Sequence, residues 1–79
     1  MIWVPSAQDE LARIWLQATD RQAVTRASAR IDFWLQRSPL SVGQPSGGKY
    51  QLIIKPLKVV YAVFPDDCQV HVLQVFVAN

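Results

Sequence analysis

The fold is decided by the stretch Pro56-Leu57-Lys58-Val59-Val60-Tyr61-Ala62-Val63, the turn Pro65-Asp66-Asp67, and the run Val70-His71-Val72-Leu73-Gln74-Val75. Both runs are rich in β-branched residues and a turn joins them, so they predict a β-hairpin with strands at 57–64 and 69–77. A two-residue turn at Asp66-Asp67 would set Val63 across from Val70 and Tyr61 across from Val72. Tyr61 is then expected to pack across strands with its hydroxyl at the sheet margin.

A first helix is predicted before this hairpin, at residues 6–19. Ser6 has a carboxylate three residues later at Asp9, which is the spacing of a capping box at a helix start. Apolar residues then recur at helical spacing, which predicts one buried face. These residues are Ala7, Leu11, Ile14, Trp15 and Ala18.

A second helix is predicted to follow almost at once and to run to about Arg37. It starts either at Thr19, with Gln22 three residues on, or at Asp20 as the cap, and Pro39 stops it because proline disfavours a helical residue before it. The short connection predicts an antiparallel αα-hairpin. The expected buried stripe of the second helix consists of Ala23, Val24, Ala27, Ile31, Trp34 and Leu35.

The remaining segments complete the predicted order. Residues 39–48 are rich in Pro, Gly and Ser and are expected to form a loop, the one candidate linker. Residues 49–55 alternate as a strand that Pro56 ends, and Ile2-Trp3-Val4 could add a short edge strand. The sequence thus predicts an α+β fold of order β-α-α-β-β-β, with the αα-hairpin packed on one face of a small antiparallel sheet.

Composition limits the class of protein. The 79 residues fit a single domain at 1–79; 51% are hydrophobic and 18% charged, which is too apolar for a disordered chain. No apolar run is long enough to span a membrane, and the first residues lack the pattern of a signal peptide, so we expect a cytoplasmic protein that does not bind membranes. Cys68 is the one cysteine, so we expect no intramolecular disulfide and no zinc cluster. The sequence has no motif for another metal site and no phosphate-binding glycine loop, so no cofactor is expected.

Charge gives two interpretations of the second half of the chain. The net charge is +2, and Lys49, Lys55 and Lys58 lie within ten residues on predicted strands. They could form a local basic patch that binds phosphate, which makes them the candidate catalytic residues. They could equally form a solvated strand edge that discourages aggregation. His71 and Cys68 are expected to be structural or surface residues.

The large aromatic residues predict a partner-binding surface. Trp15 and Trp34 fit the inner faces of the two helices, whereas Phe33 must point elsewhere because adjacent helix positions diverge by about 100°. Phe33, Trp3 and Phe76 could then form an apolar patch, which on a small domain typically marks a protein-binding site. A protein partner or a second copy of the chain would cover it; ordinary exposure of a single aromatic residue is the alternative.

Several short motifs together resemble one family, the RelE/ParE toxins of bacterial type II toxin–antitoxin systems, which include plasmid stabilisation proteins. The motifs are Glu10-Leu11-Ala12 with Ile14-Trp15, Asp20-Arg21, Ile31-Asp32, Ser38-Pro39 followed by Gly43, and Pro56-Leu57-Lys58-Val59-Val60-Tyr61. The resemblance spans nearly the whole chain. It implies a partner antitoxin whose C-terminal segment wraps the helices and sheet. It also implies one of two activities, cleavage of messenger RNA on the ribosome or poisoning of DNA gyrase.

The residues distinguish between these activities. RNA cleavage needs a group to take the 2′-hydroxyl proton, cations for the phosphate and a donor for the leaving oxygen. Lys58 stands where the family carries a basic residue, commonly arginine, with Lys49 and Lys55 on the preceding strand. Active nucleases of the family place Arg, His or Tyr on or after the last strand, but residues 73–79 contain none of these. An enzyme is therefore the less expected outcome.

Three hypotheses follow from the sequence. The first is a ParE-like toxin that acts by binding proteins, or a toxin fold with impaired catalysis. The second is a RelE-like ribosome-dependent endoribonuclease of the same fold, motivated by the three lysines. The third is a non-toxic structural or interaction domain. The expected partners are a cognate antitoxin, DNA gyrase or the ribosome with its mRNA, and a second copy of the chain.

Overall fold

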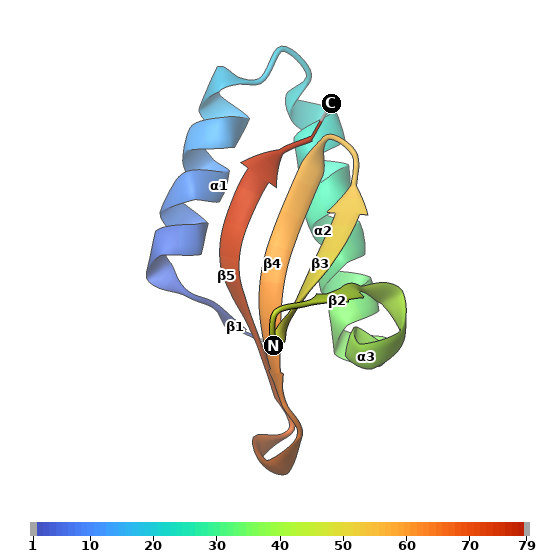
Figure 1. Cartoon of the computed structure of the whole chain (residues 1–79). Coiled ribbons are helices and arrows are strands. Elements are labelled where there is room, and N and C mark those ends of the chain that lie inside the picture. The colour runs from blue at the N-terminus through green and yellow to red at the C-terminus, as the bar shows by residue number, and fades with distance from the viewer. Residues whose placement is uncertain (1, 79) are drawn as a thin grey trace.

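The computed structural model describes residues 2–78 as two long helices, a short third helix, a 3₁₀ turn and a five-stranded sheet (Figure 1). The order is β1 (Ile2–Trp3), α1 (Pro5–Gln17), α2 (Arg21–Arg37), α3 (Pro39–Val42), β2 (Gln44–Ser46), β3 (Lys49–Ile54), β4 (Leu57–Phe64), η1 (Pro65–Asp67) and β5 (Gln69–Val77). The α+β class and the αα-hairpin are confirmed. Among the described residues, no helix has both the length and the hydropathy needed to cross a membrane.

The strands lie in the order β1-β5-β4-β3-β2. All neighbouring pairs are antiparallel except β1 and β5, which are parallel, so the sheet is mixed rather than wholly antiparallel. Tyr61 pairs with Val72 and Val63 with Val70, as predicted. The turn, however, spans four residues, because Pro65 begins a 3₁₀ turn and Cys68 closes it in the left-handed conformation with φ of 53°.

The first helix begins one residue earlier than predicted, and the expected capping box is absent. Pro5 is the first helical residue, which suits proline because its missing N–H would be unpaired there. Val4 is the N-cap and no side chain caps this end. The Val4 N–H instead donates to the carbonyl of Val72 at 3.1 Å, so pairing with β5 sets the helix start.

Asp20 caps the start of the second helix, which was one of the two predicted alternatives. The Asp20 side chain accepts a hydrogen bond from the Ala23 N–H at 3.1 Å, and the helix ends at Arg37, before Ser38-Pro39. The prediction of a loop at 39–48 is wrong. Pro39 starts the short helix α3, and residues 44–46 form the edge strand β2, joined to β3 by a turn in which Gly47 and Gly48 have positive φ.

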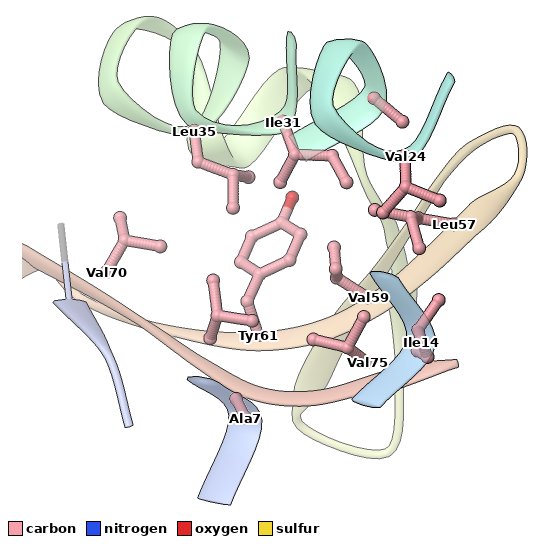
Figure 2. Close-up of a cluster of buried hydrophobic side chains, with 12 residues drawn as sticks. Ala7, Ile14, Val24, Ile31, Leu35, Leu57, Val59, Tyr61, Val70 and Val75 are labelled. Carbon is pink, nitrogen blue, oxygen red and sulfur yellow. The ribbon is translucent and has the colours of Figure 1, made fainter. Parts of the chain in front are cut away.

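The hydrophobic core lies between the helices and one face of the sheet. Figure 1 shows α2 passing behind β3 and β4 while α1 lies alongside β5. Figure 2 shows Ile31 and Leu35 pointing from α2 toward the ring of Tyr61, which is fully buried. The buried set is Ala7, Ile14, Val24, Ala27, Ile31, Leu35, Leu57, Val59, Tyr61, Val70, Val72 and Val75.

The two helix tryptophans are not core residues, contrary to the prediction. Trp15 and Trp34 are each 38% exposed. On α2 the fully buried positions Ile31 and Leu35 define the centre of the stripe, and Trp34 lies at its margin, where a large ring extends beyond the covered area. Trp15 occupies the equivalent margin of α1, beside Thr25 of α2, whose hydroxyl accepts its indole N–H at 3.1 Å.

Candidate partner-binding surfaces

The sheet leaves one face uncovered by the helices, and the strand register defines it. Tyr61, Val59 and their partners point into the core, so the alternate residues of each strand point the other way. In β5 the alternation shifts by one residue at an irregularity opposite Val60 and Tyr61. We call this second side the open sheet face. Its residues are Gln51, Ile53, Lys58, Val60, Ala62, Phe64, Gln69, His71, Gln74 and Phe76.

The open sheet face carries exposed apolar side chains among its polar ones. Ile53, Phe64 and Phe76 are 55%, 42% and 45% exposed, and Val60 and Ala62 between them are half-buried. Lys58 pairs with Phe76 on one side and with Ile53 on the other, so the lysine stands between two apolar side chains. Apolar side chains gathered on a small domain favour contact with another macromolecule.

The three candidate lysines do not form one cluster. Lys58 lies on the open sheet face, and continuing the β3–β4 register by one residue places Lys49 on the same face, across from Ala62. These two positions are four residues apart along the strand direction, roughly 13 Å. Lys55 lies beyond the end of β3 and lines a different cavity, with Ala18 and Asp20 near the α1–α2 connection.

His71 belongs to the open sheet face, a placement that the sequence alone did not single out. It pairs with Ala62, so Lys49, Ala62 and His71 lie in one row across β3, β4 and β5. Two strand spacings of about 4.8 Å put the lysine and histidine backbones on the order of 10 Å apart. The ring of His71 packs on Phe64 with 4.8 Å between centroids, and its Nε2 lies 2.9 Å from the Gln69 side-chain oxygen. The pairing of β5 with β4 was predicted, so the missing signal was the register of β3 against β4, which places Lys49 across from Ala62.

A groove runs between the two long helices. It has a volume of about 410 Å³ and is lined by both helices and by Trp3 of β1. We call it the inter-helix groove; it includes Leu11 and Trp15 from α1 and Val24 and Asp32 from α2. The Trp3 indole N–H donates to Oδ1 of Asp32 at 2.7 Å, which ties β1 to α2.

A third exposed apolar surface lies on α2, on the side away from the sheet. Phe33 is 48% exposed and packs edge-on against Trp34, with ring centroids 5.3 Å apart. The guanidinium of Arg37 lies 4.4 Å above the ring of Phe33, a cation–π arrangement that holds the ring in place. This surface is basic as well as aromatic.

The predicted single patch of Trp3, Phe33 and Phe76 is therefore wrong as a continuous surface. Trp3 pairs with the buried Val72 and points to the helix side of the sheet, whereas Phe76 pairs with Lys58 on the open side. Phe33 lies on the outer side of α2. The three aromatic residues belong to three separate surfaces, and a role in partner binding for each of them stays a prediction.

The tyrosine of the Pro-Leu-x-Val-x-Tyr stretch is structural. Burial raises the pKa of Tyr61 above its ordinary value of 10.0, the nearby Tyr50 raises it further, and a backbone hydrogen bond from Gly43 opposes both. Its hydroxyl donates to the Pro39 carbonyl rather than lying at the sheet margin, as had been predicted. Tyr61 is thus kept protonated and away from solvent at neutral pH.

The remaining reactive side chains to consider are metal ligands and the cysteine. Residues 2–78 contain no group of three or more His, Cys, Asp or Glu side chains arranged to hold a metal ion. Cys68 is exposed in the turn after η1. The surfaces described above, rather than a metal or thiol centre, are the candidate functional regions.

Comparison with known proteins supports the fold. No protein-family model matches the chain, and a search of curated proteins finds no match to it. Among solved structures, the chain is similar to a chain of the toxin–antitoxin complex RelBE2 from Mycobacterium tuberculosis, with a TM-score of 0.74 and 19% sequence identity. The match covers 96% of this chain and 86% of that chain. The RelE/ParE-like fold that the sequence motifs implied is confirmed.

Proposed function

We propose that this chain is the toxin of a bacterial type II toxin–antitoxin pair and that it acts in the cytoplasm by binding proteins, as ParE-like toxins do, or has impaired catalysis. The observation that carries the proposal is a sheet face that the helices leave uncovered, on a domain of this fold (Figure 1). Ile53 and Phe76 are exposed there on either side of Lys58, and Phe64 is exposed at the end of β4. The solved structure of similar fold is a toxin–antitoxin complex. The partner of this chain is then a cognate antitoxin, and DNA gyrase is the candidate target.

The first test is complex formation with the product of the small gene beside its own. The chain, purified through a tag after co-expression, should carry that product in fixed stoichiometry through size-exclusion chromatography with light scattering. Phe76→Ser should weaken the complex without unfolding the chain, because Phe76 is 45% exposed. Leu40→Ser is a matched control, since Leu40 is exposed on α3, away from the open sheet face.

Three outcomes of this test would count against the proposal. If the chain is monodisperse and does not bind the product of the adjacent gene, that product is not its antitoxin. If wild type and Phe76→Ser bind that product with the same affinity, the open sheet face is not part of the interface. A chain that forms a stable dimer with itself, and with nothing else, would identify a second copy as the occupant of that face.

A second candidate function is a RelE-like endoribonuclease, and the row of Lys49, Ala62 and His71 on the open sheet face favours it. Lysines would balance the negative charge that develops on the phosphate, and an imidazole can accept and donate a proton. Lys58 on the same face would add a second cation. The two basic positions lie on the order of 10 Å apart along the row, and a substrate phosphate would have to bridge them.

The nuclease hypothesis has a sharp test with an internal control. Ribosome-dependent cleavage of mRNA should be lost in Lys49→Ala, Lys58→Ala and His71→Ala and retained in Lys55→Ala, because Lys55 lies off the open sheet face. Cleavage that persists in all four variants would exclude this site. If the chain neither cleaves RNA nor arrests growth, the third hypothesis, a non-toxic interaction domain of this fold, is the one supported.

A further inference from the structure

The outer side of α2 carries three arginines and one phenylalanine in a row. They follow one another at spacings of four, three and four residues, which places them within an arc of about 60° on a helix of 3.6 residues per turn. We call them the basic row; its members are Arg26, Arg30, Phe33 and Arg37, all exposed. Leu35, on the opposite side of the helix, is fully buried. The row is roughly 16 Å long at 1.5 Å per residue.

No acidic side chain balances the charge of the basic row. Asp32 is the acidic residue within α2, and its carboxylate accepts the indole N–H of Trp3 in the inter-helix groove. Within residues 2–78, the ion pair joins Arg13 to Glu10 of α1, and no carboxylate lies within ion-pair distance of the arginines of the row. Like charges four residues apart on a helix repel each other and weaken it. An anionic partner would remove this repulsion.

Phe33 holds one of these arginines in place and does not offer a free ring. The guanidinium of Arg37 lies 4.4 Å above the Phe33 ring, and Trp34 packs against that ring at a right angle. A guanidinium that rests on a ring by its flat face can still direct its N–H groups outward, where they match phosphate oxygens. The covered ring face, however, cannot stack on an unpaired base, as proteins that bind single strands require. The arrangement therefore favours the backbone of a duplex.

The length of the basic row fits the phosphates of DNA. Each strand of duplex DNA carries one phosphate per roughly 3.4 Å of helix axis, so the row can lie along about five successive phosphates and its arginines can contact three of them. Double-stranded RNA is bound mostly through contacts across two successive minor grooves, which one row of this length does not span. Among duplexes, DNA is therefore the better match.

We propose that the basic row of α2 binds the phosphate backbone of duplex DNA. Contacts to phosphates position a protein on DNA but carry no sequence information, so the binding is independent of base sequence. The inference goes beyond the proposed function and does not depend on it. The row lies on the outer side of α2, whereas the open sheet face lies on the other side of the sheet (Figure 1).

The test is a titration of a short, fluorescently labelled DNA duplex with the purified chain, followed by fluorescence anisotropy at several salt concentrations. Three phosphate contacts predict a slope of about −2.7 for the logarithm of affinity against the logarithm of salt concentration. Affinity should then fall about fortyfold between about 50 and 200 mM salt, and equally for two duplexes of unrelated sequence.

The variants test whether the basic row itself makes these contacts. Arg30→Gln should reduce the slope to about −1.8, because one phosphate contact is lost. The fold should be retained, since Arg30 is exposed and glutamine is a good helix former. Arg13→Gln removes the same charge from an exposed position of α1 and is the matched control, which should keep the wild-type slope.

Four results would overturn the proposal. These are no binding of the duplex at the lowest salt concentration, the same slope for wild type and Arg30→Gln, an equal change of slope in Arg13→Gln, and tighter binding of an RNA duplex or a single strand than of the DNA duplex. The third result would show that net charge, and not the basic row, attracts the DNA. None of them bears on the antitoxin complex or on growth arrest, which are measured without the DNA probe.

Discussion

The hydroxyl of Tyr61 donates a hydrogen bond of 2.6 Å to the backbone carbonyl of Pro39. This bond joins the centre of β4 to the first residue of α3, 22 positions earlier in the chain. Tyr61 is fully buried, and its ring stacks on that of Tyr50 with 5.5 Å between centroids. One side chain thus fixes the segment that follows α2 against the sheet and thereby positions the edge strand β2.

Tyr61→Phe should lower the free energy of unfolding by about 1–3 kcal/mol. The substitution keeps the ring in the core but leaves the Pro39 carbonyl without its donor, and an unpaired polar group in a buried place costs about that much. Urea unfolding followed by tryptophan fluorescence measures the change. Tyr50→Phe is the matched control, since Tyr50 is only half-buried, and equal losses in the two variants would contradict the account.

Gly43→Ala should also destabilise the chain, because of the same tyrosine. A Cβ at Gly43 would overlap the hydroxyl oxygen of Tyr61 and lie 2.8 Å from its Cζ atom. The crowding should cost about 1–3 kcal/mol, as overpacking of a core does. Ser41→Ala, at an exposed position of α3, should cost little.

The double variant provides the check on this explanation. Tyr61→Phe removes the atom that the new methyl group meets first, so the two substitutions together should cost less than the sum of their separate effects. If the losses of unfolding free energy are additive, the new methyl group at position 43 does not clash with the Tyr61 hydroxyl.

The stability of the chain should depend on pH in the alkaline range because the Tyr61 phenol is buried. Because burial raises the pKa of Tyr61 in the folded chain, the unfolded chain releases this proton first as pH rises above its ordinary value of 10.0. The stability contribution is complete below that value and is lost as pH rises toward the folded-state pKa. The free energy of unfolding, measured between pH 8 and 11, should therefore fall more steeply above pH 10 for wild type than for Tyr61→Phe. The same pH dependence in both proteins would contradict this prediction.

The two helix starts should respond differently to loss of a polar side chain. Asp20→Ala removes a cap that accepts the Ala23 N–H at 3.1 Å and should cost about 1 kcal/mol. Ser6→Ala should change stability little, because no side chain caps α1. Thermal unfolding of the two variants makes the comparison, and a larger loss for Ser6→Ala would show that the capping box forms in solution.

The parts of the fold that follow from local pattern were predictable. Alternation in β4 and β5 gave Tyr61 opposite Val72, and the apolar spacing of α2 gave Ile31 and Leu35 as core. The short helix α3 and strand β2 were not predictable. Their Pro and Gly content is typical of loops, and the contact that holds them is the long-range bond between Tyr61 and Pro39.

The candidate surfaces were harder to predict than the core. Whether Trp34 is buried depends on how far the sheet extends beneath α2, which helical spacing alone does not specify. Placing Trp3 and Phe76 on opposite sides required the register of β1 and β4 against β5. The register of β3 against β4, continued by one residue, places Lys49 across from Ala62 and so in a row with His71, whereas in the sequence the two residues are 22 positions apart.

The central claim, that this chain is a toxin held in check by a partner, is tested most directly by growth of a bacterial host. The chain is induced alone and together with the adjacent small gene, with its level measured in both cultures. We predict growth arrest on induction alone and normal growth when both are expressed. Normal growth of the culture that accumulates the chain alone would contradict the account.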